Sequence, residues 1–233
     1  MKQLASSNSI HLTEVSRSFV DGGEERFAVR SVSLDIKGGE FVAIRGPSGS
    51  GKTTLLHLIS GLDVPSSGKI IVGGQDLGLM SERERANFRL NNIGFVFQSY
   101  NLIPVLSAEE NVAFVQQLRG VSPDQRKKRA RELLDKVGLS GLENRRPHQL
   151  SGGQQQRVAI ARALASHPVC VLADEPTANL DRDTAHKLML LMEDLNLAQG
   201  VTFIFSTHDD LVLQYAKRII TLADGSVVSM NQG

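Results

Sequence analysis

Cysteine is almost missing from this chain of 233 residues, which contains only Cys170. A disulfide within the chain is therefore excluded. Because Cys170 falls inside an apolar run, we expect it to be a small buried hydrophobic residue. An excess of charge is also missing, since 26 Lys and Arg stand against 25 Asp and Glu. The net charge of +1 gives no support to bulk binding of nucleic acid.

Long apolar runs are absent as well. No stretch approaches the roughly 20 residues that a membrane-spanning helix needs, and the N-terminus shows no apolar core of a signal peptide. The sequence contains no internal repeat and no low-complexity tract. With 41% hydrophobic residues, the chain is expected to form one large α/β domain with a sizeable core and a cytoplasmic character.

Residues 46–53 fit the phosphate-loop pattern G-x-x-x-x-G-K-[ST] without a mismatch. They follow a strand-like run, 41–45, and open into a helix-like run, 55–59. In this context, backbone N–H groups cradle phosphates at the start of the helix, Lys52 reaches the β- and γ-phosphates, and the Thr53 hydroxyl binds Mg²⁺. The sequence thus predicts a nucleoside triphosphate site formed by Gly46, Pro47, Ser48, Gly49, Ser50, Gly51, Lys52, Thr53 and Thr54.

A second anion-binding segment lies far downstream, at Ser151, Gly152, Gly153 and Gln154. It precedes another helix-like run, 158–165, and so offers free N–H groups and the positive end of a helix dipole. Two phosphate cradles on one small domain suggest that a nucleotide is held between two copies of the protein.

Together, the two segments resemble those of the nucleotide-binding subunit of an ATP-binding cassette (ABC) transporter, and the match covers nearly the whole chain. The resemblance implies ATP hydrolysis and an α/β phosphate-loop NTPase fold. That fold has a RecA-like core, an antiparallel β subdomain and an inserted α-helical subdomain. It also implies that Ser151, Gly152, Gly153 and Gln154 of one copy close over the γ-phosphate bound by the other.

The apolar run 169–173 ends in two carboxylates, Asp174 and Glu175. It has the pattern of a buried parallel strand that brings acids to the edge where doubly wound sheets bind ligands. By resemblance, Asp174 is the Walker B acid that holds Mg²⁺. Glu175 resembles the general base that polarises the attacking water, so it joins Lys52 and His208 as a predicted catalytic residue.

The resemblance gives roles to four further residues. Gln98 matches the glutamine that binds Mg²⁺ and senses the γ-phosphate, and His208 matches the histidine that contacts the γ-phosphate. Asp181 corresponds to a residue that crosses the dimer interface. Phe19 stands where the family places an aromatic ring, commonly Tyr, that stacks on adenine.

The predicted organisation is an N-terminal tail, 1–9, and one domain, 10–233. Within the domain, 10–98 and 166–233 form the ATP-binding core with its β subdomain, and 99–165 form the helical subdomain. Strands in 10–45 and 69–74 are expected to build the antiparallel part.

Two local patterns are sharper than the rest. Residues 122–125 read as a helix start with a capping-box pattern, and Gly138 ends that helix. Asp224 and Gly225 predict a two-residue hairpin turn. The basic residues of that helix, 126–131, are expected to form a solvated face, with anionic lipid headgroups as the alternative contact.

A cassette without a membrane span needs partners, so a second copy and a separate membrane permease are expected. Residues 94–104, 154–164 and 173–181 resemble the branch that serves lipoprotein release and macrolide export, whose permease has four spans and works by mechanotransmission. We therefore expect a peripheral protein on the cytoplasmic side of the membrane. The apolar loop 100–106 is expected either to dock a permease helix or to fold into its own core.

Three other functions stay open from the sequence. A cell-division or signalling ATPase of the same branch acts through its permease without transport. A soluble cassette ATPase would act in DNA repair or iron–sulfur assembly, although the short segment between Gln98 and Ser151 leaves no room for the insertions of DNA-repair members. A phosphate-loop kinase would lack the segment 151–154.

Overall fold

A computed structural model describes residues 8–232, so 1–7, most of the predicted tail, lie outside the described residues. The chain builds two sheets, a four-stranded one in the order β2-β1-β4-β5 and a six-stranded one in the order β10-β9-β3-β8-β7-β6. The strands of the first sheet are β1 (Ile10–Asp21), β2 (Glu24–Ile36), β4 (Ser67–Val72) and β5 (Gln75–Asp76). Those of the second are β3 (Phe41–Arg45), β6 (Ile93–Val96), β7 (Cys170–Asp174), β8 (Thr202–Thr207), β9 (Arg218–Ala223) and β10 (Ser226–Gln232).

Strand β3 belongs to the parallel sheet, which corrects the prediction that groups all of 10–45 with the antiparallel part. It pairs in parallel with both β8 and β9. The reason lies in its side chains, because Phe41 to Ile44 are all buried, whereas β2 alternates buried and exposed residues over its second half. An all-apolar run fits a strand covered on both faces, while alternation fits one with a solvated face.

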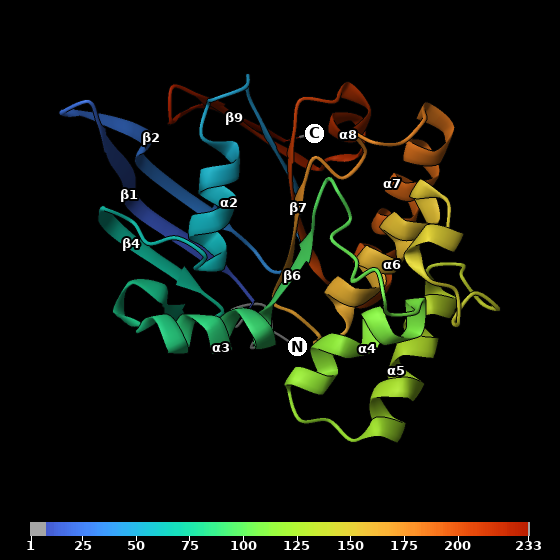
Figure 1. Cartoon of the computed structure of the whole chain (residues 1–233). Coiled ribbons are helices and arrows are strands. Elements are labelled where there is room, and N and C mark those ends of the chain that lie inside the picture. The colour runs from blue at the N-terminus through green and yellow to red at the C-terminus, as the bar shows by residue number, and fades with distance from the viewer. Residues whose placement is uncertain (1–7, 233) are drawn as a thin grey trace.

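Helix α2 (Lys52–Ser60) lies between the two sheets (Figure 1). Its buried residues Leu55, Leu56, Leu58 and Ile59 join one apolar cluster with side chains from strands of both sheets. Gly51 precedes the helix with φ at +98°, and a Cβ there would lie 2.1 Å from the carbonyl oxygen of Ala28. Only glycine allows this close approach, which fixes the start of α2 against β2.

Four of the other helices gather on the opposite side of the molecule, where green to orange segments form a helical lobe (Figure 1). A second apolar cluster joins them to the six-stranded sheet through residues such as Val112, Leu133, Ile160 and Phe205. These helices are α4 (Ala108–Leu118), α5 (Pro123–Lys136), α6 (Gly152–Leu164) and α7 (Arg182–Gln199). The remaining short elements are η1 (Leu77–Leu79), α3 (Glu82–Asn92), η2 (Pro147–Gln149) and α8 (Asp210–Tyr215). No helix within residues 8–232 is long and apolar enough to cross a membrane.

Of the two local patterns predicted from the sequence, the hairpin turn is confirmed and the capping box is not. Asp224 and Gly225 both have positive φ, +48° and +76°, and connect β9 to β10 as the hairpin turn predicts. Helix α5 begins after Ser122, but the Ser122 hydroxyl donates to the Gln125 side chain at 3.1 Å and caps no backbone N–H. The capping-box prediction is therefore wrong, because the Ser122 hydroxyl accepts from no backbone N–H of the first turn.

Candidate functional site

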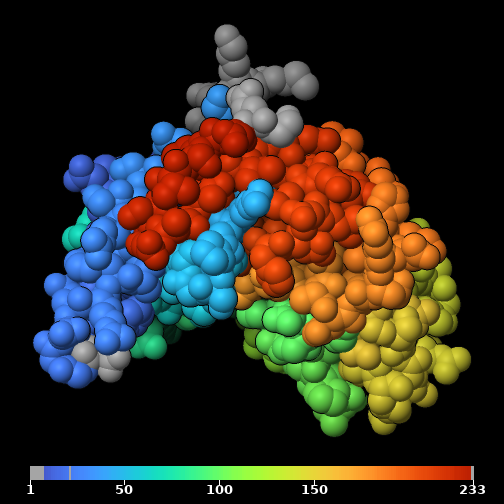
Figure 2. Space-filling view, turned by 90° about the horizontal axis from the view of Figure 1, so that it is seen from above, coloured from blue at the N-terminus to red at the C-terminus, as the bar shows by residue number. Residues whose placement is uncertain are grey.

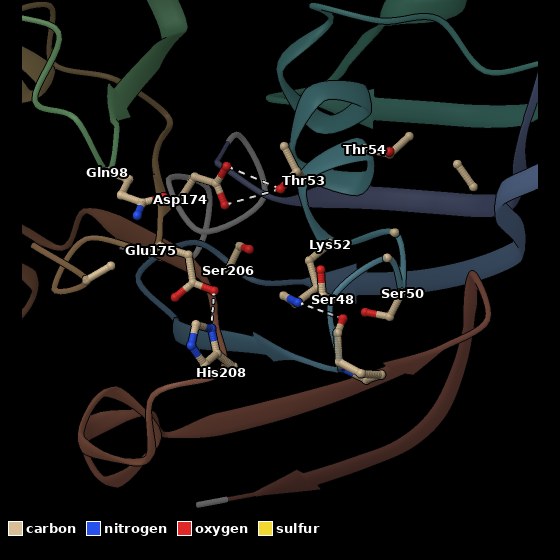
Figure 3. A pocket seen from close by; sticks show the side chains of 15 residues that line it. Ser48, Ser50, Lys52, Thr53, Thr54, Gln98, Asp174, Glu175, Ser206 and His208 are labelled. Atoms are coloured by element: carbon tan, nitrogen blue, oxygen red, sulfur yellow. Dashed lines mark hydrogen bonds and ion pairs between the residues drawn. The ribbon is translucent and has the colours of Figure 1, made fainter.

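A cavity of about 610 Å³ opens where the phosphate loop faces the C-terminal ends of β7 and β8. Figure 2 shows the cyan segment that contains the loop exposed on this face of the molecule, beside the red C-terminal part. The cavity brings together segments that lie far apart in the sequence. Its lining residues include Ser48, Ser50, Lys52, Thr53, Thr54, Gln98, Asp174, Glu175, Ser206 and His208 (Figure 3).

The phosphate loop wraps around the ammonium group of Lys52, which is only 8% exposed. Its Nζ donates hydrogen bonds to the carbonyl oxygens of Gly46 at 2.7 Å and Pro47 at 3.0 Å. A Cβ at Gly46 would lie 2.4 Å from the carbonyl oxygen of Leu222, so the loop can run this close to β9 only with glycine. The lysine is thus held beside the N-terminus of α2, where a bound anion would meet both the cation and the helix dipole.

Two side chains whose oxygen atoms could bind a metal ion lie close together beside the phosphate loop. The Thr53 hydroxyl lies 3.2 and 3.4 Å from the two carboxylate oxygens of Asp174, although the residues are far apart in the sequence. No group of three or more His, Cys, Asp or Glu side chains suited to a metal occurs among the described residues. One hydroxyl and one carboxylate nevertheless fit Mg²⁺, which takes few protein ligands and relies on water and substrate phosphates for the rest.

Glu175 is held in a fixed orientation at the end of β7. Its backbone has φ at +46°, a left-handed conformation that its N–H group supports by donating to the Ser206 carbonyl oxygen at 2.9 Å. One carboxylate oxygen is 2.7 Å from Nδ1 of His208, and the other accepts from the Thr207 hydroxyl at 3.2 Å. Glu175 is 17% exposed and His208 is 74% exposed. The Glu175 carboxylate is therefore held by two protein contacts, while the more exposed His208 imidazole lies nearer to the solvent.

Gln98 lines the same cavity from the loop that follows β6, and its side chain is exposed. Its backbone carbonyl oxygen accepts from the Asn179 side chain at 2.8 Å. This bond ties the loop after β6 to the segment that follows Glu175. Gln98 thus stands beside Asp174 and Glu175, as labelled in Figure 3.

The predicted second cradle stands elsewhere, since residues 151–154 do not line this cavity. Ser151 caps α6 by accepting from Gln154 N at 3.3 Å, and the Gln154 side chain accepts from Ser151 N at 2.9 Å. Both glycines are tightly packed, because a Cβ on Gly152 would lie 2.8 Å from the Tyr100 hydroxyl and one on Gly153 would lie 2.4 Å from Thr184. At this helix start Ser151 is exposed, Gly152 and Gln154 are half-buried and Gly153 is buried, and the segment lies apart from the phosphate loop of its own chain.

Asp181 and Phe19 also lie outside the cavity lining. Asp181 caps α7, accepting from Thr184 N at 3.0 Å and from the Thr184 hydroxyl at 2.6 Å. These bonds, the hydroxyl first, lower the pKa of its carboxyl group. Phe19 is 47% exposed on β1, with the guanidinium of Arg17 placed 4.5 Å from the centre of its ring. One face of the ring is therefore already covered by a cation.

Sequence reasoning missed four lining or supporting residues: Ala28, Ala178, Ser206 and Thr207. Ala28 contributes from β2, which only the fold brings next to the loop. Thr207 and Ser206 sit in an apolar strand where a hydroxyl gives no recognisable pattern. Only the pairing of β8 with β7 could have revealed them.

The apolar loop after Gln98 divides into two parts. Leu102 packs against the helical core cluster, and Ile103 exchanges hydrogen bonds with the buried Asn111 side chain. Val105, in contrast, is 72% exposed. The loop thus combines an anchored part with an apolar tip.

Comparison with known proteins shows the family to which the chain belongs. The family model described as ABC transporter matches residues 29–178. The lipoprotein-releasing system ATP-binding protein LolD of Idiomarina loihiensis is 44% identical over 94% of this chain and 96% of its own length. An uncharacterised ABC transporter ATP-binding protein of Mycobacterium tuberculosis is 45% identical over 94% of this chain and 88% of its own.

A similar structure is that of the ATP-binding cassette MJ0796 of Methanocaldococcus jannaschii, described as a dimer in a post-hydrolysis state bound to ADP and Pi. It superposes with a TM-score of 0.87 at 44% identity and covers 96% of this chain and 98% of its own. Family match, relatives and fold agree with the cavity built from the phosphate loop and two strand-end carboxylates. The chain belongs to the ABC transporter family and is an ATP-binding subunit with ATPase activity.

Proposed function

We propose that two copies of this chain assemble head to tail around two ATP molecules and thereby drive a separate membrane permease. The observation that carries the proposal is the separation of the two anion-binding helix starts. The phosphate loop opens into the cavity, whereas the start of α6 exposes Ser151 and does not line the cavity. A second copy turned by a two-fold axis would place its α6 over the phosphate that the first holds.

Within each site we assign roles by contact. Lys52 and the backbone of residues 46–54 would hold the phosphates, with Phe19 stacked on the adenine. Glu175, supported by Thr207 and His208, would take the proton from the attacking water. His208 would also contact the γ-phosphate, and Asp181 of the facing copy would cross the interface.

Mg²⁺ would be held by Thr53, Gln98 and Asp174, and would supply positive charge against the phosphate oxygens. The protein's own part is to set these oxygen donors at one edge of the phosphate loop. The 3.2 Å contact between Thr53 and Asp174 supports this arrangement.

The variant Glu175→Gln tests the assembly. Removing the base should slow hydrolysis by orders of magnitude while ATP still binds, so dimers should accumulate with ATP. Gel filtration with ATP and with ADP measures this, and Glu132→Gln, an exposed carboxylate on α5, serves as the control. A Glu175→Gln protein that stays monomeric with saturating ATP would overturn the head-to-tail assembly.

We also propose that the partner is a permease of the four-span, lipoprotein-release type, at the cytoplasmic face of the membrane. The similarity to LolD supports this branch. In the domain assignment we propose, 10–98 and 166–233 form the core and 99–165 the helical subdomain. The loop between Gln98 and α4 would dock a permease helix, because its exposed tip at Val105 lies on the same segment as Gln98.

A charge at the loop tip tests the docking. Val105→Glu should leave the ATPase activity of the isolated subunit unchanged and abolish its co-purification with the co-expressed permease. Leu118→Glu is the matched control, since Leu118 is 57% exposed at the end of α4. Leu102 is unsuitable because its side chain packs on the core, so a charge there would disturb folding. Retained co-purification of Val105→Glu would rule out docking at this tip.

A further inference from the structure

Ser206 is a buried hydroxyl without a protein partner. It lies in β8, its side chain is fully buried, and its Oγ finds no hydrogen-bond partner in the part of the chain that the structure describes. A buried polar group left unpaired in this way destabilises the folded protein, because it has lost its hydrogen bonds to water and gained none in exchange. Because Ser206 also lines the 610 Å³ cavity, a ligand bound there can supply the missing partner.

Its position places this hydroxyl among the reacting groups. In the sheet, Ser206 is in register with Asp174 on one side and with Ile44 on the other. Residues in register on parallel strands point to the same face, so Ser206 shares the face that carries the Asp174 carboxylate. Figure 3 shows its side chain between the two carboxylates, Asp174 and Glu175, and the ammonium group of Lys52.

Neighbouring hydroxyls are engaged or differently placed. Thr207 donates to Glu175, and Thr53 faces Asp174. The Ser50 hydroxyl also lacks a partner, but it packs under the loop, 2.5 Å from where a Cβ of Gly46 would stand. Ser206 is therefore well placed to donate a hydrogen bond to an anion beside the carboxylates without adding charge.

We propose that the Ser206 hydroxyl donates a hydrogen bond to the terminal phosphate of bound ATP and so helps the site to distinguish ATP from ADP. A phosphate oxygen that enters beside Asp174 and Glu175 meets two like charges, and a neutral donor at this point offsets part of that repulsion. ADP lacks the group that reaches this depth. The inference uses the ATP site of a single chain and does not depend on dimerisation.

The test compares nucleotide affinities of Ser206→Ala with those of the unchanged chain. The dissociation constant for ATP should rise about tenfold or more, and that for ADP should stay unchanged, since a bond to a charged group is lost with ATP alone. The ligand-free variant should unfold at the same temperature or higher, because a buried unpaired hydroxyl has been removed. Isothermal titration and thermal unfolding measure both.

The matched control is Thr202→Val at the other end of β8. Thr202 is also fully buried, but its hydroxyl accepts from the backbone N–H of Gly39 at 2.9 Å. This variant should lose stability and keep the ratio of ATP to ADP affinity. If Ser206→Ala weakens both nucleotides equally, or changes neither, the hydroxyl serves the fold or a buried water and the proposal is wrong.

Discussion

The two helix starts that the sequence predicts to bind anions are built differently. Helix α2 begins after Gly51 with no side-chain cap, and a buried lysine and two carboxylates stand around it. Helix α6 begins after Ser151 with a complete capping box, and its first residues carry no charge. The first start combines a full cation with the helix dipole, whereas the second offers the dipole, worth about half a charge, and a few donors.

This difference predicts that the two helix starts have different roles in ATP binding. On the proposed function, the α2 start would hold a triphosphate alone, because the Lys52 ammonium group, backbone N–H groups and the proposed metal ligands meet in one cavity. The α6 start would contribute a smaller binding energy, which would matter only after the other copy had bound the phosphate. Variants at each start should therefore separate binding by one chain from association of two.

The largest effect is expected for Ser151→Ala. If Ser151 contacts the γ-phosphate across a symmetric interface, two charge-assisted bonds are lost per dimer, and the ATP-dependent dimer should weaken by about a hundredfold. ATP affinity at low protein concentration should not change. Analytical ultracentrifugation of the Ser151→Ala, Glu175→Gln double variant measures this.

Ser81→Ala controls for the loss of a helix cap, because Ser81 forms the same capping box on α3. Both serine variants should lose about 1 kcal/mol of folding stability. If Ser151→Ala and Ser81→Ala weakened the dimer equally, Ser151 would make no contact of its own across the interface.

Lys52→Ala should weaken ATP binding about ten- to a hundredfold, since the ammonium group meets charge that is already present in the ground state. His208→Ala should leave binding nearly intact and lower kcat, because His208 contacts Glu175 and, on the proposed function, would act on the reacting phosphate. Steady-state kinetics with direct titration measures the two effects. Lys69→Ala, an exposed lysine on β4, is the control, and equal losses of affinity in Lys52→Ala and His208→Ala would contradict the division.

Phe19→Ala should weaken ATP and ADP equally, because both carry adenine. Stacking on an aromatic ring is worth about 1–3 kcal/mol, and we expect the lower end because Arg17 already covers one face of the ring. Val20→Ala, an exposed neighbour, is the control. If Phe19→Ala bound ATP and ADP with unchanged affinity, the adenine would contact another part of the protein.

The smallest effect concerns the other end of α6. Arg119 donates to the carbonyl oxygen of Ser166 at 3.1 Å, which places a cation at the negative end of the helix dipole. Burial first, and then the charges of Arg129, Arg119 and Lys136, lower the pKa of the nearby His167. The unfolded chain therefore binds a proton at this histidine more readily than the folded chain does, and folding stability falls as pH drops below about 6.5.

His167→Asn should reduce this acid-induced loss slightly, and asparagine tolerates the left-handed backbone at φ +54°. Urea unfolding at pH 7.5 and pH 5.5 measures the difference. An identical loss of stability in both proteins would show that His167 does not contribute.

The sequence was sufficient to predict those parts of the structure that depend only on residues close together in the chain. The phosphate loop and the hairpin at Asp224 and Gly225 need only their own residues and neighbours, so they could be predicted. The sheet to which Phe41–Arg45 belongs depends on which strands pair with it, and Ser122 leaves its helix without a side-chain cap although the residue pattern matches a capping box. Ser206 could not be found, since its meaning comes from Asp174 on the neighbouring strand.

Cys170 has a practical consequence. Its thiol is buried in β7, and burial raises its pKa to about 12, so little of the reactive thiolate forms near neutral pH. Maleimide reagents should therefore leave the folded chain unmodified. A cysteine introduced at an exposed position would be the sole attachment point for a fluorophore or spin label. Distances between two copies, with and without ATP, then become measurable without first removing a native thiol.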